Sequence, residues 1–413
     1  MIDILIEKPR KTETEYEIVC RISGTSLSKR EAKHRVKTIL RGYGGAFRTT
    51  ARFGFQAQNF TITHDPIWDA IFPLAHWMNL LLHKGGQFCE INGEPVRFRF
   101  AFPVPKQIID FYTRRAECFG HDVSFAADTI DYYEPRHTAG TALSFGGGKD
   151  SRVIAGMHKE LGIDSTLYSA DLTDDRAGLT DIEGIKISRA YSGRSVDRFM
   201  PSLMSGAAKV ALGKAFGEAQ RETPWQQYYE WTSPNSLADI SAMLASLGRE
   251  ISFETPLVVL PYNLIQKILY TRYRTLYDGQ ASTGYNAPNE KNLQVSLLKL
   301  HHDIPYHANM DDTVFEALLR QFAEDQKDEG VFGYRNHREL IRREMRGVIH
   351  AKQDNPIIAR AIPHIPDSWA APWIDYVHSN VWPDIPQPYL DIFSEYAPDI
   401  SDFTGDIPVK HIG

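Results

Sequence analysis

Three consecutive glycines followed by a lysine, an aspartate and a serine, Gly146 to Ser151, are the residues of this chain best suited to chemistry. Glycine lets the main chain adopt positive φ and approach a ligand closely, because no Cβ lies in the way. An apolar run at 142–145 precedes the glycines, and apolar side chains recur at helical spacing over 153–161. This order predicts a strand, a glycine loop and a helix. The N-terminus of such a helix binds anions, so the segment indicates a polyphosphate site.

Two other phosphate-binding patterns do not fit the glycine segment. A Walker A loop needs Ser or Thr after the lysine, whereas Lys149 is followed by Asp150, and residues 206–215 end in Gly-Lys-Ala at the wrong spacing. A dinucleotide fingerprint needs a third glycine where Arg152 and Val153 stand. The remaining alternative is a glycine-rich turn that holds no ligand.

The sequence GGGKDS closely resembles the SGGxDS motif of the PP-loop ATP pyrophosphatases, also called adenine nucleotide alpha-hydrolase-like enzymes. The resemblance implies an α/β fold with a doubly wound, HUP-like parallel sheet, and cleavage of ATP between its α and β phosphates. By position, Gly147 and Gly148 match the two glycines of the motif. Gly146 stands where the family has serine, so one hydroxyl is missing. Ser144, two residues earlier, is the candidate to replace it.

The same resemblance implies a role for each polar residue of the loop. Lys149 would neutralise the charge that builds on the leaving pyrophosphate, and Asp150 and Ser151 complete the catalytic set. Asp171 follows the second predicted strand, 165–170, at the edge where ligands gather in doubly wound sheets. A solvated acidic loop is the alternative for Asp171 and its acidic neighbours. The expected cofactors are ATP and Mg²⁺, with Ser144, Gly146, Gly147, Gly148, Asp171 and Asn286 binding ATP and with Asp150 and Asp171 holding the metal.

Asn286 belongs to a second polar segment, 278–292, which is rich in Ser, Thr, Asn and Gly. Such a segment hydrogen-bonds phosphates or polar substrates, but ordinary turns have the same composition. Two further groups are ambiguous. The histidines His301, His302 and His307 match no standard metal-ligand spacing and indicate a polar surface or a substrate rim. The basic run 335–346 has helical spacing and indicates a solvated helix face, or an arginine that reaches an anionic substrate.

The cysteines that several branches of this family carry are missing here, and their absence argues against the reactions of those branches. Ile2 stands where relatives with a built-in glutaminase carry cysteine, and paired cysteines of the sulfur-transferring kind are missing. No cysteine follows Cys118, whereas the deazaguanine nitrile synthases carry a C-terminal zinc-binding set. The ATP-dependent UDP-muramoyl-dipeptide glutamate epimerases have a similar loop and a Cys-rich C-terminal motif that this chain lacks. The resemblance covers about residues 100–320.

We therefore expect an AMP-forming enzyme that adenylates a carboxylate or carbonyl oxygen of a small-molecule substrate, for amide formation or epimerisation. Two alternatives stay open. One is a nucleobase-modifying or thiolating PP-loop enzyme, and the other is a non-catalytic ATP-binding sensor or partner subunit. A homodimer, and a partner enzyme that supplies ammonia or sulfur, are both compatible with this expectation.

Composition sets the broad class. The chain has 413 residues, 42% of them hydrophobic and 24% charged, which is typical of a soluble globular protein of two or three domains. A net charge of −6 argues against a broad nucleic-acid surface. Three scattered cysteines suit a reducing compartment. The N-terminus lacks a signal-peptide pattern, and the apolar stretch 67–82 is too short and too interrupted to cross a bilayer. We expect a cytoplasmic protein with no membrane partner.

The elements that position the glycine segment form the second of three predicted units. Residues 1–135 predict a smaller α+β N-terminal domain, residues 136–350 the PP-loop domain, and residues 351–413 a proline-rich C-terminal extension packed on the surface. Trp68 and Trp77 are expected in the core of the first unit. Its predicted strands are 3–6, 16–22, 53–63 and 96–102, its helices are 67–82 and 107–119, and the boundary segment is 132–140.

Overall fold

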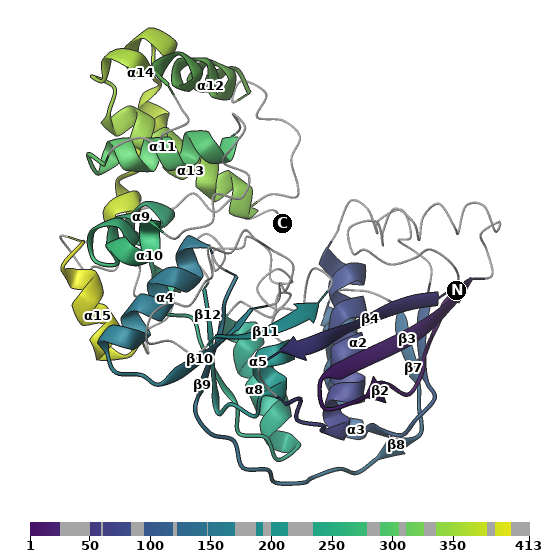
Figure 1. Ribbon diagram of the computed structural model, residues 1–413. Coiled ribbons are helices and arrows are strands. Elements are labelled where there is room, and N and C mark those ends of the chain that lie inside the picture. The colour runs from purple at the N-terminus through teal and green to yellow at the C-terminus, as the bar shows by residue number, and fades with distance from the viewer. Residues whose placement is uncertain are drawn as a thin grey trace.

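The computed structural model of the chain is a mixed α/β molecule in which one long sheet is flanked by helices (Figure 1). It describes residues 1–24, 50–58, 61–83, 95–118, 122–146, 148–169, 187–192, 200–213, 234–278, 290–304, 311–325, 336–377 and 385–397. Among these residues, no helix is long and apolar enough to cross a membrane.

Five parallel strands form the part of the sheet that carries the glycine segment. They are β9 (Thr141–Ser144), β10 (Ser165–Ser169), β11 (Ile187–Ser192), β12 (Lys209–Leu212) and β13 (Ser252–Glu254). Their spatial order is β13-β12-β9-β10-β11. The chain therefore moves outward from β9 to β11, returns to the other side of β9 at β12, and continues to β13. The prediction of a second parallel strand after the glycine helix is confirmed.

Alternation along these strands sends side chains to two separate cores, because successive residues of a strand face opposite sides of the sheet. Ala142 and Val210 belong to one core, together with α5 (Met200–Met204) and α8 (Pro234–Ser246). Leu143 and Ala211 belong to the other, together with α4 (Lys149–Glu160) and α9 (Tyr262–Thr271). Helices thus cover both faces of the parallel strands, which explains why the central residues of β9 and β12 are apolar and buried.

The N-terminal residues form the other part of the same sheet. The strands are β1 (Ile2–Ile6), β2 (Arg10–Lys11), β3 (Glu15–Gly24), β4 (Thr50–Gln58), β5 (Val96–Phe100) and β7 (Val123–Ala126), with a separate short pair β6 (Val104–Pro105) and β8 (Thr129–Ile130). The helices are α2 (Pro66–His83) and α3 (Lys106–Cys118). The two predicted helices and the strands predicted at 3–6, 16–22 and 96–102 are confirmed to within two residues at each end, whereas the strand predicted at 53–63 is shorter and ends at Gln58. Trp68 and Trp77 are each 3% exposed.

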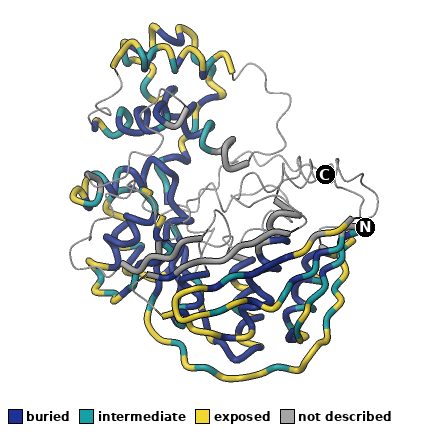
Figure 2. The backbone as a smooth tube through the Cα atoms, turned by 45° about the vertical axis from the view of Figure 1, so that its right-hand side comes forward, coloured by how far each residue is buried: buried dark blue, intermediate teal, exposed yellow. Residues whose placement is uncertain are grey.

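Helix α2 begins as its sequence predicts. The Asp65 carboxylate accepts a hydrogen bond from the backbone N–H of Ile67, and Pro66 occupies the first turn, where its missing N–H costs nothing. Arg249 also pairs with Asp65, and both side chains are 3% exposed. Arg249 donates further to the carbonyl of Glu134, so it ties α2 to the segment between β8 and β9. That segment was predicted as the boundary, and it runs along the outside of the molecule (Figure 2).

Antiparallel pairing of β11 with β4 joins the N-terminal strands to the parallel strands. The two parts therefore share one continuous sheet across the predicted boundary. They differ in the helices that pack on them, and the N-terminal part includes antiparallel pairs such as β1 with β3 and β3 with β4. The domain boundaries near residues 135 and 350 stay predictions.

The C-terminal helices form a layer in which α11 to α14 extend beyond the sheet at the top of Figure 1, while α10 and α15 lie lower, on the left of the same view. They are α10 (Arg274–Asp278), α11 (Glu290–His301), α12 (Asp312–Asp325), α13 (Asn336–Ala351), α14 (Pro356–Ala361) and α15 (Gln387–Ser394), with the 3₁₀ turns η3 (Pro256–Val259), η4 (Asp367–Trp369) and η5 (Pro372–Asp375). The described part of the extension beyond residue 350 differs from the irregular surface segment that was expected. Ile374 and Phe393 are 2% and 0% exposed, so the extension completes the core around α4 and α9.

Candidate functional site

The glycine segment lies between the end of β9 and the start of α4, in the predicted order. Phe145 donates its backbone N–H to the carbonyl of Tyr168 in β10, which continues the sheet by one residue. Gly148 is the N-cap, and the first helical bond of α4 runs from Arg152 N–H to its carbonyl. The backbone N–H groups of the first turn therefore point out of the helix at the carboxyl end of β9. Gly147 lies outside the described residues.

Two of the glycines are not required by the folding of the chain around them. Among the residues that the structure describes, no atom lies within 4 Å of a Cβ added at Gly146 or Gly148, and neither glycine has positive φ. The reasons for which proteins usually need glycine, a left-handed backbone or a crowded Cβ position, are absent at both. The open space above these glycines is instead compatible with a ligand that approaches the main chain.

Gly213, directly after β12, is in contrast a glycine that the packing of the chain requires. A Cβ there would lie 3.0 Å from the backbone N of Ser151 and 3.1 Å from Cβ of Asp150. Glycine at 213 therefore lets the end of β12 touch the first turn of α4. The ends of β9 and β12, at the position where the strand order reverses, thus meet at the glycine segment.

Lys149 and Asp150 contact each other in the first turn of α4. Lys149 Nζ lies 2.5 Å from Asp150 Oδ1 and 3.9 Å from the centroid of the Tyr262 ring. The two charged side chains are 14% and 29% exposed, so the pair is only partly open to solvent. Ser151 is buried and its Oγ donates to the carbonyl of Gly148 at 3.2 Å. All three predicted catalytic residues therefore gather at the start of α4.

The other predicted site residues are placed less completely. Ser144 ends β9, directly before Phe145, and is half-buried. Asp171 and Asn286 lie outside the described residues, so their predicted roles stay predictions. Within the described part of the chain, no group of three or more His, Cys, Asp or Glu side chains could hold a metal ion. Asp150 is thus a single carboxylate already paired with Lys149.

Glu344 of α13 is the site residue that sequence reasoning missed. Its side chain is 2% exposed, and it accepts hydrogen bonds from the backbone N–H groups of Tyr262, at 3.3 Å, and Asn263. These N–H groups belong to the first turn of α9 and have no partner inside the helix. Burial raises the pKa of the Glu344 carboxyl to about 8, against the opposing effects of these hydrogen bonds and of Lys149. The sequence offered one signal for this burial. Glu344 lies next to Met345 and four residues before Val348, which places it close to apolar positions of the predicted helix.

A second polar group surrounds the same helix start. Asp375 Oδ1 accepts from Asn263 Nδ2 at 3.1 Å and lies 2.9 Å from Nε2 of His301. His302 Nε2 lies 3.1 Å from the carbonyl oxygen of Asn263, and burial lowers the pKa of His302 to about 3. His301 and His302 are both partly exposed, so the expectation of a polar surface or a substrate rim stays a prediction. Its neighbour His307 lies outside the described residues.

The cysteine of the N-terminal part is not placed for chemistry. Cys20 is fully buried in β3, and burial raises the pKa of its thiol to about 12. A thiolate is the reactive form of cysteine, so Cys20 is inert near neutral pH. Cys89 lies outside the described residues.

Comparison of the chain with models of protein families, with curated proteins and with solved structures found no match.

Proposed function

We propose that this chain is an AMP-forming PP-loop enzyme that adenylates a carboxylate or carbonyl oxygen of a small-molecule substrate, for amide formation or epimerisation. The observation that carries the proposal is the glycine segment itself. No atom of the described residues lies within 4 Å of a Cβ built on Gly146 or Gly148, and both glycines have ordinary φ, at the start of a twelve-residue helix and at the carboxyl edge of parallel strands. A bound polyphosphate accounts for glycines that local folding does not need.

The strand order supports the same proposal. The order β13-β12-β9-β10-β11 equals 5-4-1-2-3 by chain position, which is the order of a doubly wound, HUP-like sheet read from its other edge. Ligands of such sheets bind at the carboxyl ends of the two strands where the order reverses. Here these are β9 and β12, and the glycine segment follows β9.

The residues present suit ATP as substrate. The first-turn N–H groups of α4 and the Lys149 ammonium would hold the β and γ phosphates and stabilise the negative charge of the leaving pyrophosphate. An oxygen of the second substrate attacks the α phosphorus as the bond to the bridging oxygen breaks, so AMP is transferred and pyrophosphate leaves. Mg²⁺ would shield phosphate charge beside Asp150, with Asp171 as a second proposed ligand.

Crystals soaked with magnesium and α,β-methylene-ATP, which resists cleavage between the α and β phosphates, test the proposal directly. Phosphate density over residues 146–151 is expected, and its absence refutes the proposal. In solution, Lys149→Met should weaken binding of this analogue at least tenfold. Lys159→Met, at the exposed end of the same helix, is the matched control and should leave binding unchanged.

Incubation of the protein with ATP, magnesium and a set of candidate carboxylic acids then distinguishes an adenylating enzyme from a non-catalytic ATP sensor. Release of AMP and pyrophosphate with any acid supports adenylation. Binding of the analogue without turnover over a broad set of acids favours the non-catalytic alternative, in which the missing serine at Gly146 leaves ATP bound but uncleaved.

A further inference from the structure

The ammonium group of Lys149 lies on the face of an aromatic ring that comes from a distant part of the chain. Its Nζ is 3.9 Å from the centroid of Tyr262, and the lysine side chain is 14% exposed. A cation is attracted to the face of an aromatic ring, and more strongly where water is excluded. Because a lysine side chain has four rotatable bonds, this contact removes much of the freedom of its charged end.

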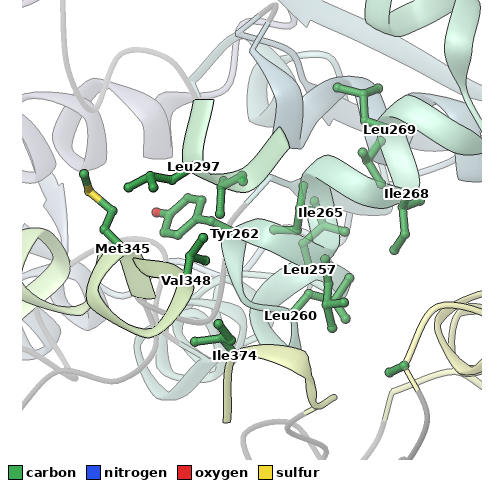
Figure 3. Packing of buried hydrophobic residues seen from close by; sticks show 14 of the residues in the cluster. Leu257, Leu260, Tyr262, Ile265, Ile268, Leu269, Leu297, Met345, Val348 and Ile374 are labelled. Carbon is green, nitrogen blue, oxygen red and sulfur yellow. The ribbon is translucent and has the colours of Figure 1, made fainter. Parts of the chain in front are cut away.

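Tyr262 is itself held rigidly. It is 6% exposed and follows η3, whose four residues are fully buried. Figure 3 shows the Tyr262 ring in the packed cluster that includes Leu297 and Val348. The ring therefore has little room to follow Lys149 if the lysine moves, and its position is set by the C-terminal helices.

Glu344 fixes the backbone of Tyr262. Its carboxyl oxygens accept hydrogen bonds from the backbone N–H groups of Tyr262 and Asn263, the first two residues of α9, which have no acceptor within the helix. The acid comes from α13, the helix of the basic run, whose role the proposed function leaves unexplained. A chain of contacts thus runs from α13 through Tyr262 to Lys149.

We infer that Tyr262 is a positioning residue for Lys149, and that Glu344 acts on Lys149 through Tyr262. The C-terminal helical layer then determines where the ammonium group stands in the phosphate site. This inference rests on the proposed function for its consequence, ATP binding, but the placement of Lys149 is measurable without ATP. Asp150 pairs with the same ammonium group, so loss of the ring leaves a charge pair without a fixed position.

Lysine reactivity tests the placement. Wild type, Tyr262→Phe and Tyr262→Leu are treated briefly with acetic anhydride, and acetylation of Lys149 is measured by mass spectrometry relative to Lys159, an exposed lysine of the same helix. We expect Tyr262→Leu to raise relative acetylation of Lys149 about tenfold, the size of a partly desolvated cation–π contact, and to weaken magnesium–ATP binding to a similar extent. Tyr262→Phe keeps the ring and should match wild type in both. Equal acetylation of Lys149 in Tyr262→Leu and wild type overturns the inference.

The role of Glu344 needs a double substitution. Glu344→Ala should raise acetylation of Lys149, but should add nothing once Tyr262 is already leucine, because residues that act through one another are not additive. Additive effects overturn the part of the inference that concerns Glu344. If acetylation follows the expected pattern while neither wild type nor any variant binds magnesium–ATP, the positioning stands and the proposed function fails.

A measurement on wild type covers the case in which Tyr262→Leu does not fold. Lysines are reductively methylated with ¹³C, and the Lys149 signal is identified by its loss in Lys149→Arg. The ring current of Tyr262 should move this signal upfield of the exposed lysines. A Lys149 signal among those of the exposed lysines overturns the inference.

Discussion

Replacement of Glu344 by glutamine should remove one cause by which this protein loses stability as pH rises. The carboxyl is fully buried, and its pKa in the folded chain is about 8, against 4.5 as the ordinary value. Between these values the folded state holds a proton that the unfolded state has released. The stability that this group contributes is therefore fully present below about pH 4.5 and is lost as pH rises towards 8, by about 1.4 kcal/mol per pH unit.

Glutamine keeps an oxygen that can accept from the first turn of α9, but it does not titrate. Relative to wild type, Glu344→Gln should thus gain about 2 to 3 kcal/mol in the free energy of unfolding between about pH 5.5 and about pH 7.5. Urea unfolding followed by tryptophan fluorescence, at several pH values for both proteins, measures this difference. His158 and His302 have lowered pKa values and act in the opposite direction, but they are common to both proteins, so their effect cancels in the difference.

Glu324→Gln is the control, because Glu324 is an exposed acid of α12. It should change the free energy of unfolding by the same small amount at every pH. A difference between Glu344→Gln and wild type that stays constant with pH refutes the reasoning, since the carboxyl would then be ionised in the folded chain throughout this range.

Three further predictions concern particular contacts. Gly146→Ser should leave the thermal midpoint unchanged, because its Cβ meets no atom of the described residues within 4 Å. If the proposed match to the PP-loop motif is correct, the added hydroxyl should strengthen binding of α,β-methylene-ATP, and weaker binding contradicts that match. Gly156→Val should lower the free energy of unfolding by about 1 to 3 kcal/mol in urea titrations, since its Cβ would lie 2.6 Å from the ring of Tyr273, and an unchanged value contradicts the close packing of α4 there. Arg249→Met should cost about 3 kcal/mol of stability in the same assay, because buried Asp65 then keeps only the more distant Arg136, whose Nη1 lies 4.0 Å away. Arg249→Met combined with Asp65→Asn should recover part of that loss.

Local patterns in the sequence predicted the elements well. The spacing of apolar residues and the Asp65-Pro66 start identified α2, and the apolar run, glycines and helical spacing identified β9, the loop and α4. Trp68 and Trp77 were expected in the core and are buried. These features depend on neighbours within a few residues, which is why one sequence suffices to find them. The extension beyond residue 350 was missed because its prolines start the helices α14 and α15 rather than breaking them.

The sequence by itself determined where the glycine segment starts and ends, and which polar residues accompany it, because a turn and a helix start are local structures. Only the tertiary structure decided what surrounds Lys149. The pairing of β12 beside β9 brings Gly213 to Ser151, and the packing of α9 and α13 brings Tyr262 and Glu344 to the lysine. These contacts join residues far apart in the chain, and whether an acid such as Glu344 is solvated or buried depends on which helix end lies opposite it. No pattern of neighbours along the chain contains that information.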